Sequence, residues 1–490
     1  MSLRSGHARK VEHLNAALED AGSYAQWLEI ARELDHLEGL AEWREDDESD
    51  LYHYALLRQH VAELRAYRDE GNAVLLFEVL QESAYRHMAE ISNPELYQVA
   101  RAGTKHLIGE YLDQVVAAMH FICDTEFAGA TAAQKLAHFV RAEHVYGRPA
   151  LMMSGGAALG IYNLGVIYAL LEEDVLPTVI SGASMGSFIA VVIGSRTRSE
   201  LIEMFHNLDQ LHTTALQLVS PMSMLRDKVV MDSKQLFKCI RANTGPLTFQ
   251  ESFEKSGLII NLSVSPTRAR QKPRLLNYLT TPNVLLAHGS LASCAIPHVF
   301  PPVTLMCKDA HGNEVPYMGT ETWSDGSVYS DIPRQRMSRL HNVNKAIVSQ
   351  SNPHVIPFMA MKQKKTLATT TRNAVLHSLK AQTSIALDFA RSSVRNRGLR
   401  SFLDKAHAVA VQQYSGDINI HLPPKPSIYK KILTNPDLES LQHFMLLGQR
   451  ATWPRLPCIV DQTRVNRAFD QCIAKLRVAV ELEQGNPGRV

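Results

Sequence analysis

One stretch restricts the possible folds of this chain more than any other. Residues 178–195 join a short apolar run, the pentapeptide GASMG at 182–186 and a second apolar run of small residues. A Gly-x-Ser-x-Gly turn places its serine at a sharp strand-to-helix corner, above a helix N-terminus that favours negative charge. A β-carbon at Gly182 or Gly186 would crowd the turn or the helix behind it. The stretch therefore predicts a nucleophile elbow with Ser184 at its tip.

A second unit of strand, glycine loop and helix lies directly upstream. Residues 150–153 are typical of a buried strand, 154–160 form a glycine-rich loop, and a helix continues to residue 171. Such a loop presents backbone N–H groups that suit a phosphate or the oxyanion of an acyl-transfer intermediate. The loop lacks the Gly-Lys-Ser/Thr end of a P-loop and the Gly-x-Gly-x-x-Gly spacing of a dinucleotide site. With an elbow serine close behind it, the oxyanion interpretation is favoured.

Composition and cysteine spacing indicate an ordinary globular chain. Its 490 residues are 45% hydrophobic and 20% charged, with a net charge of +2, which is enough for two or three domains and gives no reason to expect a nucleic-acid partner. The six cysteines form no C-x-x-C pair, and no histidine spacing matches a zinc motif, so we expect neither a metal nor another cofactor. The first residues lead into a charged helical pattern rather than a secretory signal, which favours a cytoplasmic protein.

Two long uncharged stretches must be distinguished from membrane spans. Residues 149–171 and 175–195 contain no Asp, Glu, Lys or Arg and are long enough to cross a bilayer. Each would place a glycine turn in mid-bilayer, where the freed backbone groups find no water. Each divides better into a buried strand, a turn and a helix, as in a parallel sheet covered on both faces. We therefore expect no transmembrane span.

The rest of the chain divides into regions of different character. Helical apolar spacing through residues 12–147 predicts an all-helical N-terminal domain at 1–147, followed by an α/β core at 148–345 and a mainly helical C-terminal region at 346–490. Residues 12–100 carry 20 acids and 6 bases, which predicts solvated helix faces. Residues 358–407 carry 10 bases and 2 acids. That basic segment predicts either attachment to an anionic membrane or a helical stretch packed on the core with its bases in water.

Four further segments within the core, and Asp325, have predicted roles. Residues 199–218 are expected to be helical, and 258–264 and 274–278 to be strands. The small apolar stretch at 292–297 is either a helix ending over the core or a wall of an acyl pocket. Asp325 follows the nucleophile by 141 residues and is a candidate base for it, although the dipeptide alone would indicate an ordinary Asp-Gly turn.

Taken in order, GGAALG at 155–160, GASMG at 182–186 and DG at 325–326 resemble the motifs of the patatin-like phospholipase family. The resemblance extends over most of residues 20–455 to the patatin-type triacylglycerol lipases of fungi and plants. The flanking matches are Trp27, Leu34 with Asp35, Trp43, NP at 93–94, GTK at 103–105, ASCA at 292–295, NVN at 342–344, SQSNPH at 349–354, GDI at 416–418 and RATWP at 450–454.

The resemblance implies a three-layer α/β/α core with a mostly parallel sheet and a Ser-Asp dyad that needs no histidine. Ser184 is then the nucleophile and Asp325 the base. The amides of Gly155, Gly156, Ala157 and Met185 form the oxyanion hole, and the elbow and turn glycines are Gly160, Gly182, Gly186 and Gly326. Plant patatin has a glycine in place of Ala157 and a base in place of Leu159, so this apolar loop fits the neutral-lipid branch.

The predicted activity is hydrolysis of lipid acyl esters through an acyl-enzyme, with triacylglycerol as the first choice of substrate. The alternatives are a phospholipase A or lysophospholipase, a non-catalytic lipid-binding scaffold, and an α/β-hydrolase triad that would require His354, His377 or His421 beside Ser184. The partner is lipid at a membrane or lipid-droplet surface. We therefore expect a cytoplasmic protein that is peripherally membrane-associated.

Overall fold

The structure is a computed structural model. It describes residues 2–83, 88–127, 130–227, 229–268, 271–353, 355–356, 414–424, 428 and 432–483. The predicted basic segment at 358–407, His354 and His377 lie outside the described residues.

The chain before the first strand is helical, as predicted from its apolar spacing. In α2, the side chain of Ser23 caps the helix N-terminus by accepting the N–H of Gln26, and Trp27, Ala31 and Leu34 form the buried stripe. The helices of this region are α1 (Ser2–Asp20), α2 (Tyr24–Leu37), α3 (Leu40–Glu45), α4 (Tyr54–Asp69), α5 (Ala73–Ser83), α6 (His106–Asp124) and α7 (Ala132–Tyr146), with 3₁₀ turns η1 (Met88–Glu90) and η2 (Pro94–Tyr97).

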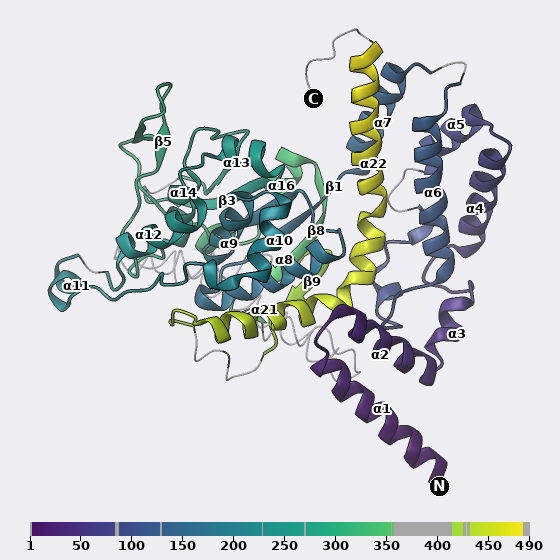
Figure 1. Ribbon diagram of the computed structural model, residues 1–490, viewed down its shortest axis with the longest axis horizontal. Coiled ribbons are helices and arrows are strands. Elements are labelled where there is room, and N and C mark those ends of the chain that lie inside the picture. The colour runs from purple at the N-terminus through teal and green to yellow at the C-terminus, as the bar shows by residue number, and fades with distance from the viewer. Residues whose placement is uncertain are drawn as a thin grey trace, which may run out of the picture.

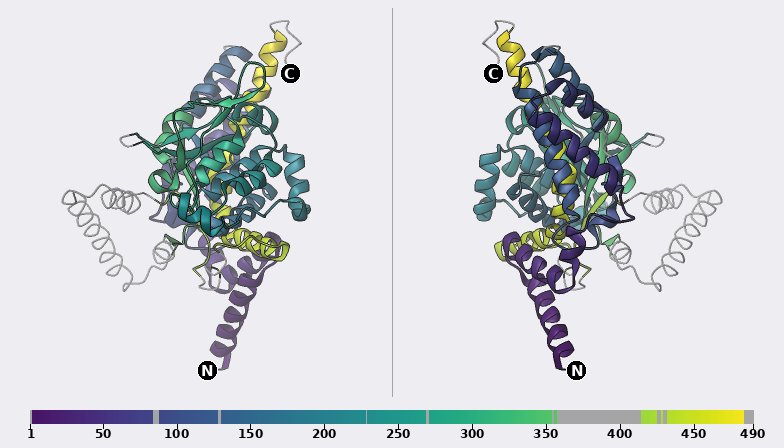
Figure 2. Two further views of the ribbon diagram at one scale, coloured as in Figure 1. Left: turned by 90° about the vertical axis from the view of Figure 1, so that its left-hand side faces the viewer. Right: turned by 90° about the vertical axis from the view of Figure 1, so that its right-hand side faces the viewer.

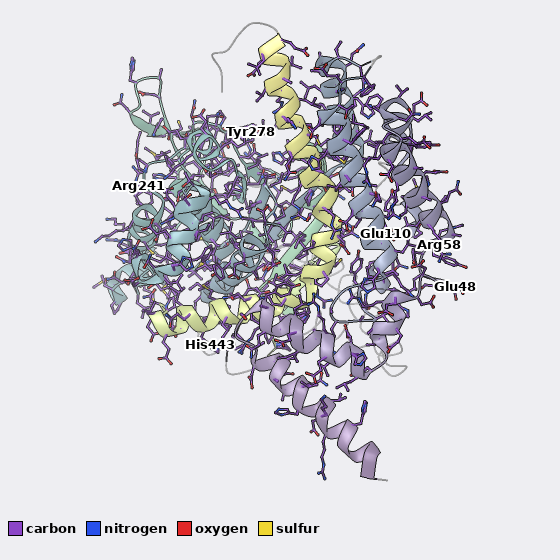
Figure 3. The ribbon with its side chains drawn as sticks, turned by 45° about the vertical axis from the view of Figure 1, so that its right-hand side comes forward. Glu48, Arg58, Glu110, Arg241, Tyr278 and His443 are labelled. Carbon is purple, nitrogen blue, oxygen red and sulfur yellow. The ribbon has the colours of Figure 1, made fainter. Side chains whose placement is uncertain are left out.

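The N-terminal helices form a bundle that the last helix of the described residues completes. Helix α22 (Leu456–Glu483) runs alongside α6 and α7 (Figure 1). Phe469 of α22 packs in one cluster with Tyr111 of α6 and Phe139 of α7, and its ring centroid lies 6.1 Å from that of Phe139. The charged side chains of this region, including Arg58 and Glu110, project from the outer faces of the bundle (Figure 3). The bundle core is therefore built from both ends of the sequence.

A seven-stranded, mostly parallel sheet forms the centre of the second part. Its order is β4-β3-β2-β1-β8-β9, with β7 paired to β3. Strands β1, β2, β3, β8 and β9 are parallel, whereas β4 and β7 run antiparallel to β3. The strands are β1 (Arg148–Met153), β2 (Val179–Gly182), β3 (Ile259–Pro266), β4 (Arg274–Leu276), β7 (Trp323–Asp325), β8 (Val343–Gln350) and β9 (Ile418–His421), while β5 (Met306–Lys308) and β6 (Glu314–Pro316) form a separate pair.

Helices cover both faces of the sheet, which confirms the predicted three-layer core. Along β1, Leu151 and Met153 belong to one apolar cluster and Ala150 and Met152 to another, because successive side chains point to opposite faces. The helices of this part are α8 (Tyr162–Glu172), α9 (Met185–Gly194), α10 (Arg198–His206), α11 (Pro221–Asp227), α12 (Ser233–Thr244), α13 (Phe249–Ser256), α14 (Leu286–Cys294), α15 (Ser327–Ser330), α16 (Arg334–His341) and α21 (Leu438–Thr452), with the 3₁₀ turns η3 (Ala157–Ile161), η4 (Leu208–Gln210) and η5 (Trp453–Arg455).

Helices α8 and α21 are in direct backbone contact. A β-carbon at Gly165 of α8 would lie 1.8 Å from the carbonyl oxygen of Met445, and one at Gly448 of α21 would lie 2.2 Å from that of Tyr162. Since real β-carbons do not approach other atoms so closely, each helix needs its glycine. A C-terminal helix thereby supports the helix that follows the glycine loop.

The helix predicted at 199–218 is shorter than expected. Helix α10 ends at His206, and after the turn η4 residues 211–218 are not helical. Side-chain amides replace the missing helical hydrogen bonds: Asn243 Oδ1 accepts the N–H of His212, and Asn435 Oδ1 accepts those of Ala215 and Leu216. Within the described parts of the chain, no helix is both long and apolar enough to cross a membrane.

Candidate active site

Ser184 stands at a strained corner between β2 and α9. Its backbone has φ 50° and ψ −124°, a left-handed conformation that costs a non-glycine residue about 1–3 kcal/mol. A β-carbon at Gly182 would lie 2.2 Å from the carbonyl oxygen of Gly186, and one at Gly186 would lie 2.5 Å from that of Met153. Both glycines are therefore required by close backbone approaches, as expected for a nucleophile elbow.

Ser293 of α14 holds the elbow in place. The backbone N–H of Ser184 donates to Ser293 Oγ at 3.1 Å, and Ser293 Oγ donates to the carbonyl oxygen of Ser263 on β3 at 2.8 Å. The stretch 292–297 had been predicted as a helix end or a pocket wall, and α14 does end there, at Cys294. Its role in anchoring the elbow was missed. The available signal was a hydroxyl within an otherwise small and apolar segment.

Asp325 ends β7, and the sheet brings it close to Ser184. It pairs with Val264 of β3, its N–H donates to the carbonyl oxygen of Ala295 at 2.9 Å, and its Oδ1 accepts the N–H of Ser327 at 2.7 Å. The side chain is fully buried, and this burial raises the pKa of Asp325 to about 6, while hydrogen bonds from Ser327 and the Ser184 hydroxyl act in the opposite direction.

One oxygen of the Asp325 carboxylate and the turn that follows this residue are set by the surrounding structure. Within the described part of the chain, its Oδ2 lacks a hydrogen-bond partner of normal length. A β-carbon at Gly326 would lie 2.2 Å from the carbonyl oxygen of Ser263, so only glycine allows the turn after Asp325 to pack against β3. Among the residues that the structure describes, one oxygen of the buried carboxylate therefore remains without a hydrogen-bond partner of normal length.

The glycine loop lies against the nucleophile. A β-carbon at Gly155 would be 3.0 Å from Cβ of Ser184. The N–H of Gly155 is occupied, because it donates to Oδ1 of Asp331 at 2.9 Å. Over the residues that the structure describes, the amides of Gly156, Ala157 and Met185 have no hydrogen-bond partner. These three of the four predicted donors are therefore available to a developing negative charge.

Asp331 is a second buried acid that the sequence analysis did not single out. It is 1% exposed, and its Oδ2 accepts a hydrogen bond from Nδ2 of Asn352 at 2.5 Å. Burial raises the pKa of Asp331 to about 8, and the neighbouring charge of Asp325 adds to this rise. The pKa of Asp331 therefore lies above that of Asp325, so Asp325 is the first of the two acids to ionise as the pH rises.

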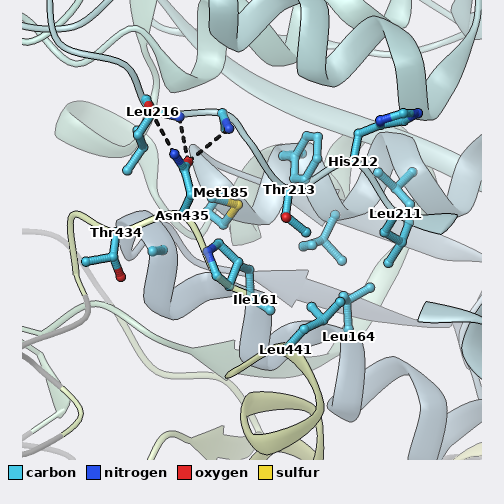
Figure 4. A pocket seen from close by; sticks show the side chains of 16 residues that line it. Ile161, Leu164, Met185, Leu211, His212, Thr213, Leu216, Thr434, Asn435 and Leu441 are labelled. Carbon is cyan, nitrogen blue, oxygen red and sulfur yellow. Dashed lines mark hydrogen bonds between the residues drawn. The ribbon is translucent and has the colours of Figure 1, made fainter. Parts of the chain in front are cut away.

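An apolar pocket begins beside the elbow (Figure 4). It contains about 500 Å³ of space, part of which is open to solvent. On α9, Met185, Phe188, Ile189 and Val192 line it, so it follows one helix face for roughly 10 Å from the residue next to Ser184. The other lining residues are Ala158, Ile161, Leu164, Leu211, His212, Thr213, Ala215, Leu216, Thr434, Asn435, Pro436 and Leu441. The pocket adjoins the elbow through Met185 and Ala158, although neither Ser184 nor Asp325 lines it.

His421 does not lie where a catalytic triad would need it. It ends β9, which is three strands away from β2 in the sheet, or roughly 14 Å at the usual strand spacing. No histidine in the described ranges forms a hydrogen bond with Ser184 or Asp325. Nor do the described residues contain a group of three His, Cys, Asp or Glu side chains that could hold a metal ion.

Comparison with known proteins identifies two domains along the chain. A domain of unknown function, DUF3336, matches residues 4–144, and the patatin-like phospholipase domain matches residues 151–336. The chain is 34% identical to triacylglycerol lipase ptl3 of Schizosaccharomyces pombe over 90% of its own length and 92% of that protein. It is 32% identical to triacylglycerol lipase SDP1L of Arabidopsis thaliana over 93% of its own length and 57% of that protein.

Other relatives are longer than this chain. Triacylglycerol lipase 5 of Saccharomyces cerevisiae is 30% identical over 95% of this chain and 66% of that protein. Among solved structures, VipD of Legionella pneumophila covers 61% of this chain and 67% of that chain at 14% identity and a TM-score of 0.28, which is too low to support an argument about the fold. On the sequence matches, this chain belongs to the patatin-like phospholipase family and carries a DUF3336 domain in front of its patatin-like domain.

Proposed function

We propose that this protein hydrolyses the acyl esters of neutral lipids, with triacylglycerol as its principal substrate. The observation that carries the proposal is a strained elbow serine that faces a buried carboxylate, beside unoccupied amides and an apolar pocket. The names of the similar lipases from fission yeast, budding yeast and Arabidopsis support the same substrate class.

The proposed reaction proceeds in two steps of acyl transfer. Ser184 Oγ attacks the ester carbonyl carbon while Asp325 accepts the hydroxyl proton, and the amides of Gly156, Ala157 and Met185 stabilise the oxyanion. Asp325 then donates its proton to the departing alcohol. A water molecule, deprotonated by Asp325, releases the fatty acid and restores Ser184. A pKa near 6 makes Asp325 a better base than an ordinary carboxylate while leaving it ionised at neutral pH.

The pocket provides a place for the fatty acyl chain. It starts at Met185, beside the nucleophile, and its α9 face consists of Met185, Phe188, Ile189 and Val192. Among the described residues, the pocket lining contains no Lys or Arg and is mostly apolar, which suits a fatty acyl chain. The names of the similar triacylglycerol lipases favour triacylglycerol over the phospholipase A or lysophospholipase alternative. We also propose that the protein acts in the cytoplasm, attached peripherally to the surface of a membrane or lipid droplet.

The proposal is tested with purified protein and matched tri-, di- and monoacylglycerols and phospholipids of one acyl composition. We expect the fastest fatty-acid release from triacylglycerol, and no release by Ser184→Ala or Asp325→Asn. Faster cleavage of the phospholipids would transfer the assignment to the phospholipase alternative. Binding of lipid without release of fatty acid from any substrate would instead indicate a scaffold.

A further inference from the structure

An excursion of the chain projects from the α/β core next to the pocket. Leu218 pairs with Met231, and the N–H of Val219 donates to the carbonyl oxygen of Val230 at 3.0 Å. Helix α11 lies between these paired positions and stands away from the core in both the front and side views (Figures 1 and 2). Its Met222 is 77% exposed, and Leu218 at its base is 65% exposed.

A second exposed apolar strip lies beside this excursion, before and at the start of α21. Leu433 is 63% exposed and Leu438 is 46% exposed. Asn435, between them, joins the strip to the segment that leads to α11, because its Oδ1 accepts the N–H groups of Ala215 at 3.0 Å and Leu216 at 2.7 Å (Figure 4). Its Nδ2 also donates to the carbonyl oxygen of Leu216 at 2.8 Å.

We name these two strips, whose segments Asn435 joins, the apolar rim. Its members are Leu218, Met222, Met224, Leu433 and Leu438. Elsewhere on the described surface the large exposed apolar side chains, such as Val145 and Leu482, belong to other elements, and such scattered residues are ordinary. The rim differs because its members gather around one feature.

That feature is the apolar pocket. Residues 211–213, 215–216 and 434–436 contribute to the pocket lining, and the same two segments continue directly into the rim at Leu218 and Leu433. From the rim, apolar surface therefore runs through the pocket to Met185, the neighbour of the nucleophile. A water-insoluble substrate that enters this pocket must come from the phase that holds it. The rim is the surface that would meet that phase.

We propose that the apolar rim attaches this protein to a lipid surface, by inserting the side chains of α11 and of the segment before α21 among the acyl chains. This inference rests on the proposed function and specifies where the substrate phase is met. Exposed Met and Leu side chains suit such insertion, since each transfers apolar area out of water and Met adapts to irregular surroundings. Attachment through the rim places the pocket opening at the lipid surface, so an acyl chain need not cross water.

The test uses the full chain with Met222→Asp, Leu433→Asp and the double variant. The matched control is Leu482→Asp, whose side chain is 66% exposed, near the C-terminal end of α22. That end of α22 lies far from α11 (Figure 1). Each protein is floated with a triolein emulsion coated with phosphatidylcholine, and fatty-acid release is compared with turnover of the soluble ester p-nitrophenyl butyrate. All three substituted side chains are exposed, and unfolding temperatures check that the four variants are folded.

We expect each single rim variant to bind the emulsion about tenfold more weakly and the double variant about a hundredfold more weakly, from the free energy of inserting one large apolar side chain. The ratio of emulsion turnover to soluble-ester turnover should fall in parallel, and the control should match the wild type. If the double variant floats with the emulsion as strongly as the wild type, the inference is overturned. If that binding also weakens as salt is added, the attachment is through the basic segment at 358–407 instead. Failure of every protein to hydrolyse either ester would refute the proposed function alone, since flotation still reports on the rim.

Discussion

Replacing Asp325 by asparagine should abolish hydrolysis and, at the same time, stabilise the folded protein at alkaline pH. Asp325 is fully buried, and its pKa is raised from 3.8 to about 6 mainly by that burial. The folded state therefore resists ionisation of this group more than the unfolded chain does. Asparagine keeps an oxygen that can accept the N–H of Ser327 but carries no charge. The substitution should remove a destabilising charge together with the catalytic base.

The size and the sign of the stability change follow from the raised pKa of Asp325. An acid with a raised pKa costs the folded state nothing below pH 3.8, and the cost grows as pH rises until it is complete above about pH 6. The difference between these two pKa values destabilises the folded state by about 3 kcal/mol at pH 8 and by about 1.6 kcal/mol at pH 5. Asp325→Asn should thus gain stability over the wild type at both pH values, and nearly twice as much at pH 8.

Urea unfolding at pH 5 and pH 8 measures this difference through the shift of the midpoint at unchanged slope. Ser184→Ala is the matched control, because it is expected to be equally inactive yet retains the buried carboxylate, so its midpoint should not rise with pH relative to the wild type. Asp331 also titrates in this region, with a pKa of about 8, and Asp325 raises it, so part of the measured gain at pH 8 comes from that coupling. Equal midpoints for Asp325→Asn and wild type at both pH values would refute the argument that Asp325 is a desolvated carboxylate.

Three further predictions concern the pH profile and the packing. Because Asp325 must be ionised to act as a base, turnover of a soluble ester should fall about tenfold from pH 7 to pH 5; a profile flat down to pH 5 would contradict a pKa near 6. Gly165→Ala should unfold or severely destabilise the protein, since its β-carbon would lie 1.8 Å from a backbone oxygen. Gly109→Ala in α6 is the control: its β-carbon meets nothing within 4 Å, so the free energy of unfolding should rise by about 1 kcal/mol. Comparable melting temperatures for the two variants would refute this packing. Lys105→Met should lower the free energy of unfolding by about 3 kcal/mol, because the substitution leaves three buried carbonyl oxygens without a donor. The Lys105 ammonium donates to the carbonyl oxygens of Trp43 and Asp46 at 2.7 Å and of Glu48 at 3.1 Å. An unchanged urea midpoint would show that water satisfies these carbonyl oxygens instead.

The elements nearest the nucleophile could be predicted from the sequence because the constraints on them are local. The elbow needs Gly182 and Gly186 within two residues of Ser184, and the glycine loop follows its strand directly. Continuous apolar runs identified β1 and β2 as strands buried on both faces, and the structure confirms both. In each case the information lies within about ten residues of chain, which is the range over which periodicity and turn chemistry act.

The features that escaped prediction depend on residues far apart in the chain. The N–H of Gly155 meets a carboxylate 176 residues later, at Asp331. The N–H of Ser184 meets the hydroxyl of Ser293, 109 residues later. The local sequence around either acceptor does not say which distant N–H it will accept. Likewise, the region 346–490 was predicted to be mainly helical, but not that the apolar face of α22 would join the N-terminal bundle. The predicted division at residues 147 and 345 remains a prediction.

These distant contacts also stabilise the strained backbone of Ser184 and the buried charge of Asp325. The left-handed Ser184 costs about 1–3 kcal/mol and the buried charge of Asp325 about 3 kcal/mol, a large share of the 5–15 kcal/mol that usually separates folded from unfolded proteins. Such features persist only where the surroundings hold them from several sides. Ser293 fixes the elbow, Asp331 fixes the glycine loop, and the backbone contact between α8 and α21 fixes the helix behind that loop. The C-terminal helix α21 is therefore part of the support of the site, even though it is more than 250 residues away from Ser184 in the sequence.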